Sequence, residues 1–453
     1  MTIRFLPLIA LALPCAAGAE TPSLQSAIGD PSDFKLSASV RLRYETLDGQ
    51  PRADLPPSDR QLDSRATLFA EYDPGVVRFG AELYDSRAWL NRPGDSLDTT
   101  QVNTLELVQA YVAADFDAPF GAGSKAGLQA GRFKLDLGSR RLFADDDFRN
   151  TTTGFTGLRA NLRTAGGLAA TAFYVLPQVR LPDDRAGLAG QSPEWDRESF
   201  ALQAWGALLA RPETLAGATA ELGYFGLRER DWAGHPTRNR DLDTFSARVI
   251  RDPRPGAIDF ELEGFYQSGT IRTGTAPDAP VQAVGAWAMH ADAGRLFPGR
   301  AKLRLSLEFD RVGGDKAGGR YGRFDTLYGM RRADFGPAGI YNDIGRANIE
   351  SFGLRAEIAP SPRFDAFATW HALWLAEKTD AFSTTGVRDP TGASGSFAGH
   401  QFDLRIRYWL VPKFLRAEAN AVWLAKGRFL HDAPNAPDAG NTHYLAGSLT
   451  ASF

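Results

Sequence analysis

Residues 34–45 read FKLSASVRLRYE, and apolar and polar side chains alternate along this stretch. The apolar set is Leu36, Ala38, Val40, Leu42 and Tyr44. Because successive side chains of a β-strand point to opposite faces, such a strand has one face suited to lipid and one suited to water. The same alternation occurs in residues 302–310 (KLRLSLEFD) and 401–409 (QFDLRIRYW). The sequence therefore predicts an all-β protein built from two-faced strands.

Short turn sequences and long polar stretches alternate along the chain. The short turns include residues 73–75 (DPG), 252–256 (DPRPG) and 297–299 (FPG). The long stretches are residues 49–61, 178–197, 312–348, 377–399 and 429–442. Transmembrane β-barrels have tight turns on one side, long loops on the other and strands of about 9–11 residues. We therefore expect a single antiparallel transmembrane β-barrel.

Counting the alternating segments gives eighteen predicted strands. They span residues 34–46, 63–72, 76–89, 104–116, 126–136, 155–164, 168–177, 199–210, 217–228, 243–251, 257–269, 282–293, 301–311, 350–359, 364–375, 401–410, 414–427 and 443–453. The number is even, and a periplasmic N-terminus places every long connection on the extracellular side. Residues 312–348 also contain a strand-like piece, so this segment is either a loop inserted into the pore or a surface hairpin.

The N-terminus has the pattern of an export signal. Arg4 gives a charged start, residues 5–13 form a short apolar run, and Ala17-Gly18-Ala19 is a small-x-small cleavage site. Pro14 before Cys15 argues against a lipoprotein, and cleavage after Ala19 leaves a mature chain without cysteine. We expect a signal peptide at 1–19, a short periplasmic segment at 20–33 and the barrel at 34–453.

The overall composition favours a membrane barrel over a soluble β-sandwich, whose half-buried strands also alternate. The mean hydropathy is −0.27, too polar for a bundle of membrane helices, and Tyr44, Tyr408 and Trp423 stand at strand ends as in interfacial girdles. The chain ends on Phe453 behind alternating small and apolar residues, the pattern that the barrel assembly machinery recognises. We expect the outer membrane of a Gram-negative bacterium, with lipid and lipopolysaccharide around the barrel and no nucleic-acid partner.

Arginine dominates the predicted inner face. The chain has 8 lysines and 43 arginines, and strand alternation points Arg41, Arg43, Arg65, Arg159, Arg355, Arg405 and Arg407 inward. Guanidinium stays charged and binds carboxylates in two places, so these residues predict an anion-selective lumen. Two alternatives stay open: a compositional excess of arginine, and neutralisation by inward acidic residues such as Glu45, Glu308 and Glu418.

Enzymatic readings find little support. The six histidines show no metal-binding spacing, and His371 in an apolar run is expected to be a wall residue. Asp145-Asp146-Asp147 cannot all face one ion from an extended chain, so a solvated loop is expected there. We predict no catalytic residue, metal or cofactor.

Several stretches, in their order along the chain, resemble the alginate export porins. They are residues 81–87 (AELYDSR), 131–133 (GRF), 138–142 (GSRRL), 155–159 (FTGLR), 371–380 (HALWLAEKTD), 403–409 (DLRIRYW) and 425–429 (AKGRF). The resemblance implies a monomeric eighteen-stranded barrel with an arginine-rich constriction for alginate or another acidic saccharide. It adds Arg132 and Arg87 to the expected pathway, although the parity of Val77, Phe79 and Leu83 turns Arg87 outward unless a bulge intervenes.

Two classes of function follow. The first is a selective channel for an anionic saccharide, with a general or other small-molecule porin as its near alternative. The second is a barrel plugged by residues 312–348 that has a structural or surface-binding role.

Overall fold

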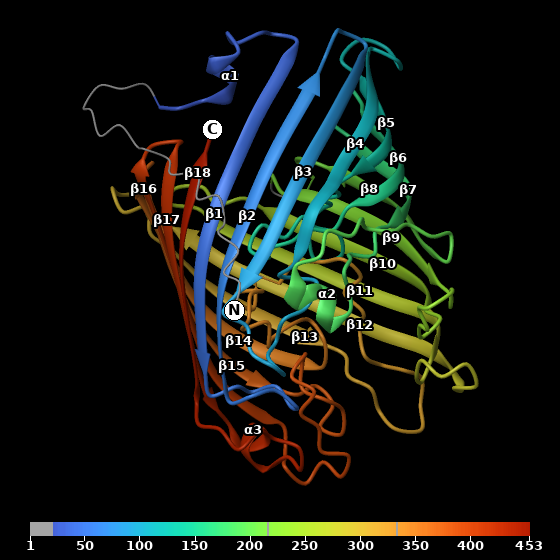
Figure 1. Ribbon diagram of the computed structural model, residues 1–453, viewed down its shortest axis with the longest axis vertical. Helices are drawn as coiled ribbons and strands as arrows, with labels where there is room; N and C mark the ends of the chain where they lie inside the picture. The colour runs from blue at the N-terminus through green and yellow to red at the C-terminus, as the bar shows by residue number, and fades with distance from the viewer. Residues whose placement is uncertain (1–20, 215–216, 332–333) are drawn as a thin grey trace.

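The computed structural model describes residues 21–214, 217–331 and 334–453. Within these ranges the chain forms eighteen strands and three short helices (Figure 1). The helices are α1 (Leu24–Ala27), α2 (Arg185–Gly190) and α3 (Arg428–Asp432). The predicted signal peptide, residues 1–19, lies outside the described residues.

All eighteen predicted strands are present, with ends shifted by a few residues. The strands are β1 (Phe34–Asp48), β2 (Ser58–Tyr72), β3 (Val77–Trp89), β4 (Asn103–Asp117), β5 (Lys125–Phe133), β6 (Phe155–Arg163), β7 (Ala169–Pro177), β8 (Leu202–Arg211), β9 (Thr219–Glu229), β10 (Asp241–Arg251), β11 (Ile258–Arg272), β12 (Val281–Leu296), β13 (Arg304–Val312), β14 (Ile349–Ser361), β15 (Phe364–Trp374), β16 (Phe397–Val411), β17 (Leu415–Lys426) and β18 (Thr442–Ser452).

Each strand pairs antiparallel with the next, and β18 pairs with β1 to close the barrel. Phe453 follows β18 directly and extends this seam. Its backbone exchanges hydrogen bonds of 3.2 and 2.8 Å with Ala38, and its ring lies 5.3 Å from that of Phe414. Closure leaves no unpaired sheet edge in the membrane, which is the condition for a β-sheet to cross a bilayer.

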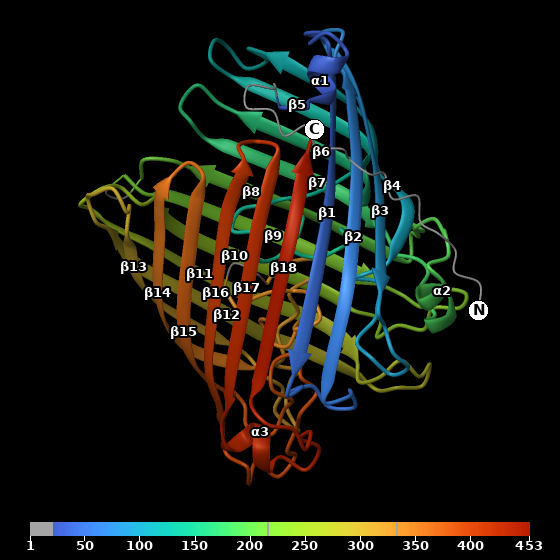
Figure 2. The ribbon, with the colours of Figure 1, turned by 60° about the vertical axis from the view of Figure 1, so that its left-hand side comes forward.

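The short connections gather at one end of the barrel and the long loops at the other, as the sequence predicts. Residues 73–76, 362–363 and 412–414 are among the short turns, at the end where α1 and the C-terminus lie (Figures 1 and 2). The opposite end carries the long loops and α3. No helix among the described residues is long and apolar enough to cross a membrane.

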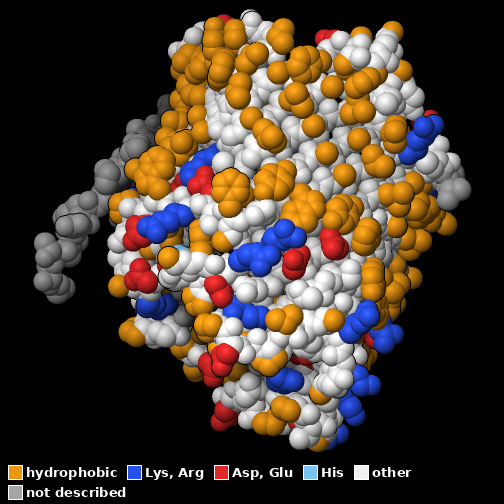
Figure 3. All heavy atoms as spheres, turned by 90° about the vertical axis from the view of Figure 1, so that its right-hand side faces the viewer, with side chains coloured by type: hydrophobic (Ala, Val, Ile, Leu, Met, Phe, Trp, Pro, Cys, Tyr) orange, Lys and Arg blue, Asp and Glu red, His pale blue; other side chains and the backbone are white. Residues whose placement is uncertain are grey.

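Strand alternation sorts the side chains as expected. On β1, Leu42 is 52% exposed on the outer surface, whereas its neighbour Arg43 is 2% exposed inside. On β16, Phe402, Leu404 and Ile406 lie outside with Asp403 buried between them. Toward the end with the short turns, the outer surface is covered by hydrophobic side chains, while charged side chains gather toward the long loops (Figure 3).

The interior differs from the expected wet lumen. Phe143 lies inside the barrel with its ring 5.0–5.9 Å from Phe155, Phe173, Phe225 and Tyr328. These aromatic residues belong to a large buried cluster that joins inward wall residues to the loops. The apolar cluster fills part of the lumen and confines any aqueous path to the rest.

Candidate functional site

Two loops turn inward from the long-loop end and meet inside the barrel. The first inserted loop, residues 134–154, joins β5 to β6, and the second inserted loop, residues 313–348, joins β13 to β14. Their backbones bond to each other, since Tyr328 N donates to Leu142 O at 2.8 Å and Met330 N donates to Arg140 O at 3.1 Å. The segment that the sequence left open as a plug or a hairpin is therefore an inserted loop.

Three of the predicted lumenal arginines hold the first inserted loop. Arg41 donates to the backbone oxygens of Asp147 and Arg149 at 2.6 and 2.7 Å, and Arg65 lies 2.6 Å from the Asp147 carboxylate. Arg43 donates to Phe148 O and its guanidinium lies over the Phe148 ring. Although burial opposes ionisation, Arg65 and Arg41 hold the pKa of Asp147 well below its usual range. The solvated loop expected at residues 145–147 is thus an anchored segment of the pore.

A cavity of about 210 Å³ remains between the inserted loops and the wall, and we call it the constriction cavity. Six arginines line it, namely Arg41, Arg43, Arg140, Arg405, Arg407 and Arg416. The lining carboxylates are Asp146, Asp147 and Glu418. Among the lining side chains, cationic ones outnumber anionic ones two to one. Behind the lining, Arg43 also lies 2.7 Å from Glu45 and 2.9 Å from Asp63.

Strand register explains how the wall arginines meet. Arg416 on β17 pairs with Thr450 on β18, Thr450 pairs with Arg41 on β1, and Arg41 pairs with Arg65 on β2. Paired residues on neighbouring strands lie side by side on the same face. Arginines that are far apart in the sequence therefore form one row across four strands.

Arg405 and Arg407 share a single carboxylate. Both lie close to Asp365 on β15, at 3.1 and 2.9 Å. The Phe367 ring on the same strand lies between two guanidiniums, 4.7 Å from that of Arg405 and 3.9 Å from that of Arg355 on β14. Asp365 is therefore a shared partner of two arginines that line the cavity.

The sequence matches a protein-family model over residues 32–441, and that family is described as alginate export. The chain belongs to the alginate export family. Family and fold together make it a porin-like channel of the outer membrane. Among curated proteins, no sequence matches this chain.

The fold is shared with solved porins of Pseudomonas aeruginosa. OccK2 (OpdF), in complex with glucuronate, has 15% sequence identity and a TM-score of 0.56, covering 93% of this chain and 97% of its own. OccK3 (OpdO) has 14% identity and a TM-score of 0.56, covering 93% and 96%. OpdL has 12% identity and a TM-score of 0.57, covering 93% and 99%. At these identities the likeness shows the fold alone.

Two arginines that the family resemblance adds do not face the lumen. Arg87 shares the outer face of β3 with Phe79 and Leu83 and pairs with Asp85 at 2.9 Å. The strand pairing of β3 with β4 is irregular, but the extra residues belong to β4, so β3 keeps its alternation. A lumenal position for Arg87 is therefore wrong.

Arg132 also lies on the outward parity of its strand. Leu128, four residues earlier on β5, is 55% exposed, whereas the next residue, Phe133, is buried inside. The Arg132 guanidinium lies 2.7 Å from Glu106 and 2.9 Å from Glu198, which comes from the loop before β8. The expected lumenal position of Arg132 is wrong, because strand alternation and two carboxylates direct it elsewhere.

Arg159 and Arg355 keep the inward parity that alternation predicts. Arg159 shares a face of β6 with the buried Phe155, and no described residue supplies a carboxylate within ion-pair distance of it. Arg355 lies 2.8 Å from Glu357 on its own strand. Neither lines the constriction cavity, so of the predicted residues that cavity collects Arg41, Arg43, Arg405 and Arg407.

Three residues of the site are not among those predicted from the sequence. Arg416 stands two positions before Glu418, whose inward orientation is predicted, so the same alternation places it in the lumen. Asp365 begins a predicted strand, but only its contacts identify it as the shared partner of two arginines. Arg140 lies in a loop, where no periodic signal exists.

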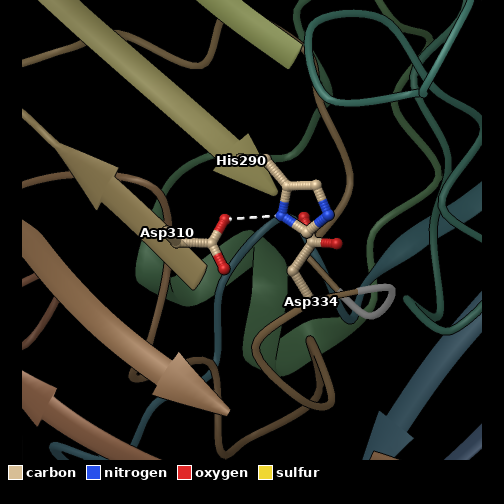
Figure 4. A group of neighbouring side chains, drawn as sticks. All are labelled: His290, Asp310 and Asp334. Carbon is tan, nitrogen blue, oxygen red and sulfur yellow. Dashed lines mark hydrogen bonds and ion pairs between the residues drawn. The ribbon is translucent and has the colours of Figure 1, made fainter. Parts of the chain in front are cut away.

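A buried charge network ties the second inserted loop to β12 and β13 of the adjacent wall. His290 on β12, Asp310 on β13 and Asp334 on the loop have side-chain atoms within 4.8 Å of one another (Figure 4). His290 Nδ1 lies 2.8 Å from Asp310, while Asp334 binds Arg141 at 3.0 Å and also binds Arg346. Two guanidiniums on Asp334 disfavour a metal cation there, so we assign the group a structural role.

A cavity of about 1060 Å³ does not belong to the pore. It is a depression of the outer wall lined by Leu305, Leu354, Trp370, Phe402 and Trp423. Apolar side chains of this kind on the outside of a membrane barrel face lipid.

Proposed function

We propose that the barrel passes carboxylated saccharides through the constriction cavity. The supporting observation is the excess of arginine there, with six guanidiniums against three carboxylates. A narrow passage lined by one sign of charge raises the local concentration of the opposite ion. A guanidinium also binds a carboxylate through two parallel hydrogen bonds, which favours carboxylates over simple anions.

The comparisons support a sugar acid as the solute. The family takes its description from the export of alginate, an acidic polysaccharide, and the OccK2 structure contains glucuronate. Both are carboxylated saccharides. The pathway arginines in this proposal are Arg405, Arg407, Arg416, Arg41 and Arg140, whereas Arg43 is held by Glu45 and Asp63 at 2.7 and 2.9 Å.

The decisive experiment is reversal-potential measurement on the purified protein in planar bilayers. Wild-type protein in a salt gradient is expected to prefer anions, and added oligoglucuronate is expected to block the current. Arg405→Glu with Arg407→Glu would leave three carboxylates, counting Asp365, where two guanidiniums stood. This variant is expected to prefer cations and to lose the block.

Two further variants separate charge from geometry. Arg405→Lys with Arg407→Lys should keep the anion preference but weaken the block, because lysine lacks the planar fork. Arg254→Glu changes an exposed residue of a short turn and should leave both measurements unchanged. Wild-type behaviour of the double glutamate variant would contradict the proposal at this site.

The inserted loops support one alternative, a closed barrel that acts through its surface. They fill part of the lumen with apolar side chains. A closed barrel predicts no open-state conductance in the same bilayers, whereas the channel predicts conductance through the constriction cavity.

A further inference from the structure

A second cavity lies on the other side of the second inserted loop, and we call it the outer cavity. Its volume is about 440 Å³, within the usual range for small-molecule sites. It is lined by residues of the loop between β9 and β10, by the second inserted loop and by Thr384. Met330 lines the constriction cavity and the next residue, Arg331, lines the outer cavity. Adjacent residues of the second inserted loop therefore line the two cavities.

Three of the five arginines that line the outer cavity are already neutralised. Arg240 lies 2.7 Å from Glu229 and 2.8 Å from Asp325. Arg323 lies 2.8 Å from Asp380, and Arg346 binds Asp334. These ion pairs hold the surrounding loops in place and leave little charge for a solute.

Arg238 and Arg331 differ, because their partners among the described residues are neutral. Arg238 donates to Arg272 O at 2.9 Å and to the Tyr321 hydroxyl at 3.2 Å. Arg331 donates to Asn342 O at 3.0 Å. Burial and the nearby Arg149 lower the pKa of Arg331 to about 10, so it stays protonated in neutral solution. A partly buried cation without a carboxylate is stabilised by a bound anion.

The rest of the lining suits a sugar. The Tyr321 ring lies 4.9 Å from the Arg238 guanidinium, and the backbone of Tyr321 is fixed to β12 by hydrogen bonds of 2.8 and 3.0 Å. Thr237, Thr326 and Thr384 place hydroxyl-bearing side chains around the cavity. A flat ring, several hydroxyl groups and two guanidiniums without an ion pair among the described residues provide both apolar and charged contacts.

We propose that the outer cavity is a second binding site for a carboxylated sugar unit, with Arg238 and Arg331 binding the carboxylate and Tyr321 contacting the ring. The inference rests on the proposed function, since it gives the same solute a second site in series. Conduction through a selective pore requires binding that is favourable at entry but divided among several sites, so that the solute can leave. Two cavities lined by the adjacent residues Met330 and Arg331 meet that requirement.

The test measures block by a trisaccharide of glucuronate added on the long-loop side of the full barrel in planar bilayers. Arg238→Gln with Arg331→Gln is expected to slow association of the trisaccharide about tenfold, the usual size of a lost charge-assisted contact. The reversal potential in simple salt should stay near wild type, because the constriction arginines are intact. The matched control is Arg230→Gln, which removes an exposed charge from the same loop outside the cavity and should not change the block.

The outcomes distinguish a failure of the outer binding site from a failure of the proposed anion-selective channel. Unchanged block in Arg238→Gln with Arg331→Gln, beside a wild type that prefers anions, overturns the outer site and leaves the constriction intact. Equal slowing by Arg230→Gln also overturns it, because a general surface field would then explain the effect. A wild type without anion preference defeats the proposed function itself. If the double glutamine variant does not fold, Arg238→Lys with Arg331→Lys must weaken the block, and wild-type block in that variant contradicts the inference.

Discussion

Two sides of the barrel wall carry arginine and use it differently. On β11–β13, arginines are surrounded by carboxylates: Arg304 contacts Asp259, Asp292 and Glu357, and Arg141 from the first inserted loop contacts Glu261, Glu263 and Asp334. On β16, Arg405 and Arg407 share one carboxylate.

The difference shows that the local ratio of charges decides the role of an arginine. An arginine with two or three carboxylates holds the structure together, whereas arginines that share a carboxylate and line the cavity can attract a solute. The excess of arginine in the composition is therefore divided between anchoring and selectivity.

The largest effect is expected from Arg141→Leu, on the acidic side. Arg141 is buried and its loss leaves Glu261, Glu263 and Asp334 without their shared partner. Removing one member of a buried ion-pair network costs about 3–5 kcal/mol. The free energy of unfolding in detergent, followed by heat-modifiable mobility, should fall accordingly. Arg140→Leu, at the neighbouring half-buried position with one carboxylate partner, should cost far less, and equal losses would mean that the network does not hold the loop.

A smaller effect, dependent on pH, is expected where the second inserted loop meets the β1–β2 side. Asp343 is buried 3.0 Å from Arg52, and burial raises its pKa to about 7 despite that partner. The folded state therefore keeps a neutral carboxyl in mild acid but must bury a charge in mild base, so this group lowers stability as pH rises through about 7. The unfolded carboxyl has a pKa of about 3.9, so the loss builds up between about pH 4 and about pH 7 and is about 2.5 kcal/mol from about pH 5 to about pH 8. Asp343→Asn should remove most of it, and an unchanged pH dependence of the melting temperature in that variant would contradict this account.

The sequence predicts the wall well and the lumen poorly, for one physical reason. Alternation is a local property of a strand, so it places Arg41, Arg43, Arg405 and Arg407 inside and counts the strands. The inserted loops are held by contacts between distant segments, such as Arg65 with Asp147 and Arg141 with Asp334. Such contacts leave no periodic pattern in the sequence. The aromatic side chains in the lumen and the role of residues 145–147 could therefore not be predicted. Arg132 shows the converse: family resemblance places it inside, while strand parity, read from Leu128, turns it outward.

Asp365→Asn should increase the excess of positive charge on the side of the wall that carries Arg405 and Arg407. The change removes the carboxylate that Arg405 and Arg407 share. A unit charge about 6 Å from the ion path contributes about 0.7 kcal/mol in a water-like medium, or roughly threefold in relative permeability. The reversal potential should shift toward stronger anion preference, opposite in sign to the glutamate variants of Arg405 and Arg407. A shift toward cations would show that Asp365 orients the two guanidiniums more than it neutralises them.

The smallest effect is expected from Arg87→Gln, which should leave the selectivity of the channel unchanged. Arg87 belongs to a stretch that resembles the alginate export porins, yet its side chain lies on the outer face of β3 beside Asp85. A charge on that face is separated from the ion path by the barrel wall and is screened by salt over about 8 Å. The reversal potential and the block by oligoglucuronate should both equal those of the wild type. If Arg87→Gln instead weakens the anion preference as an inward arginine would, β3 must change its parity before residue 87, and strand alternation would no longer be sufficient to assign the residues of the pathway.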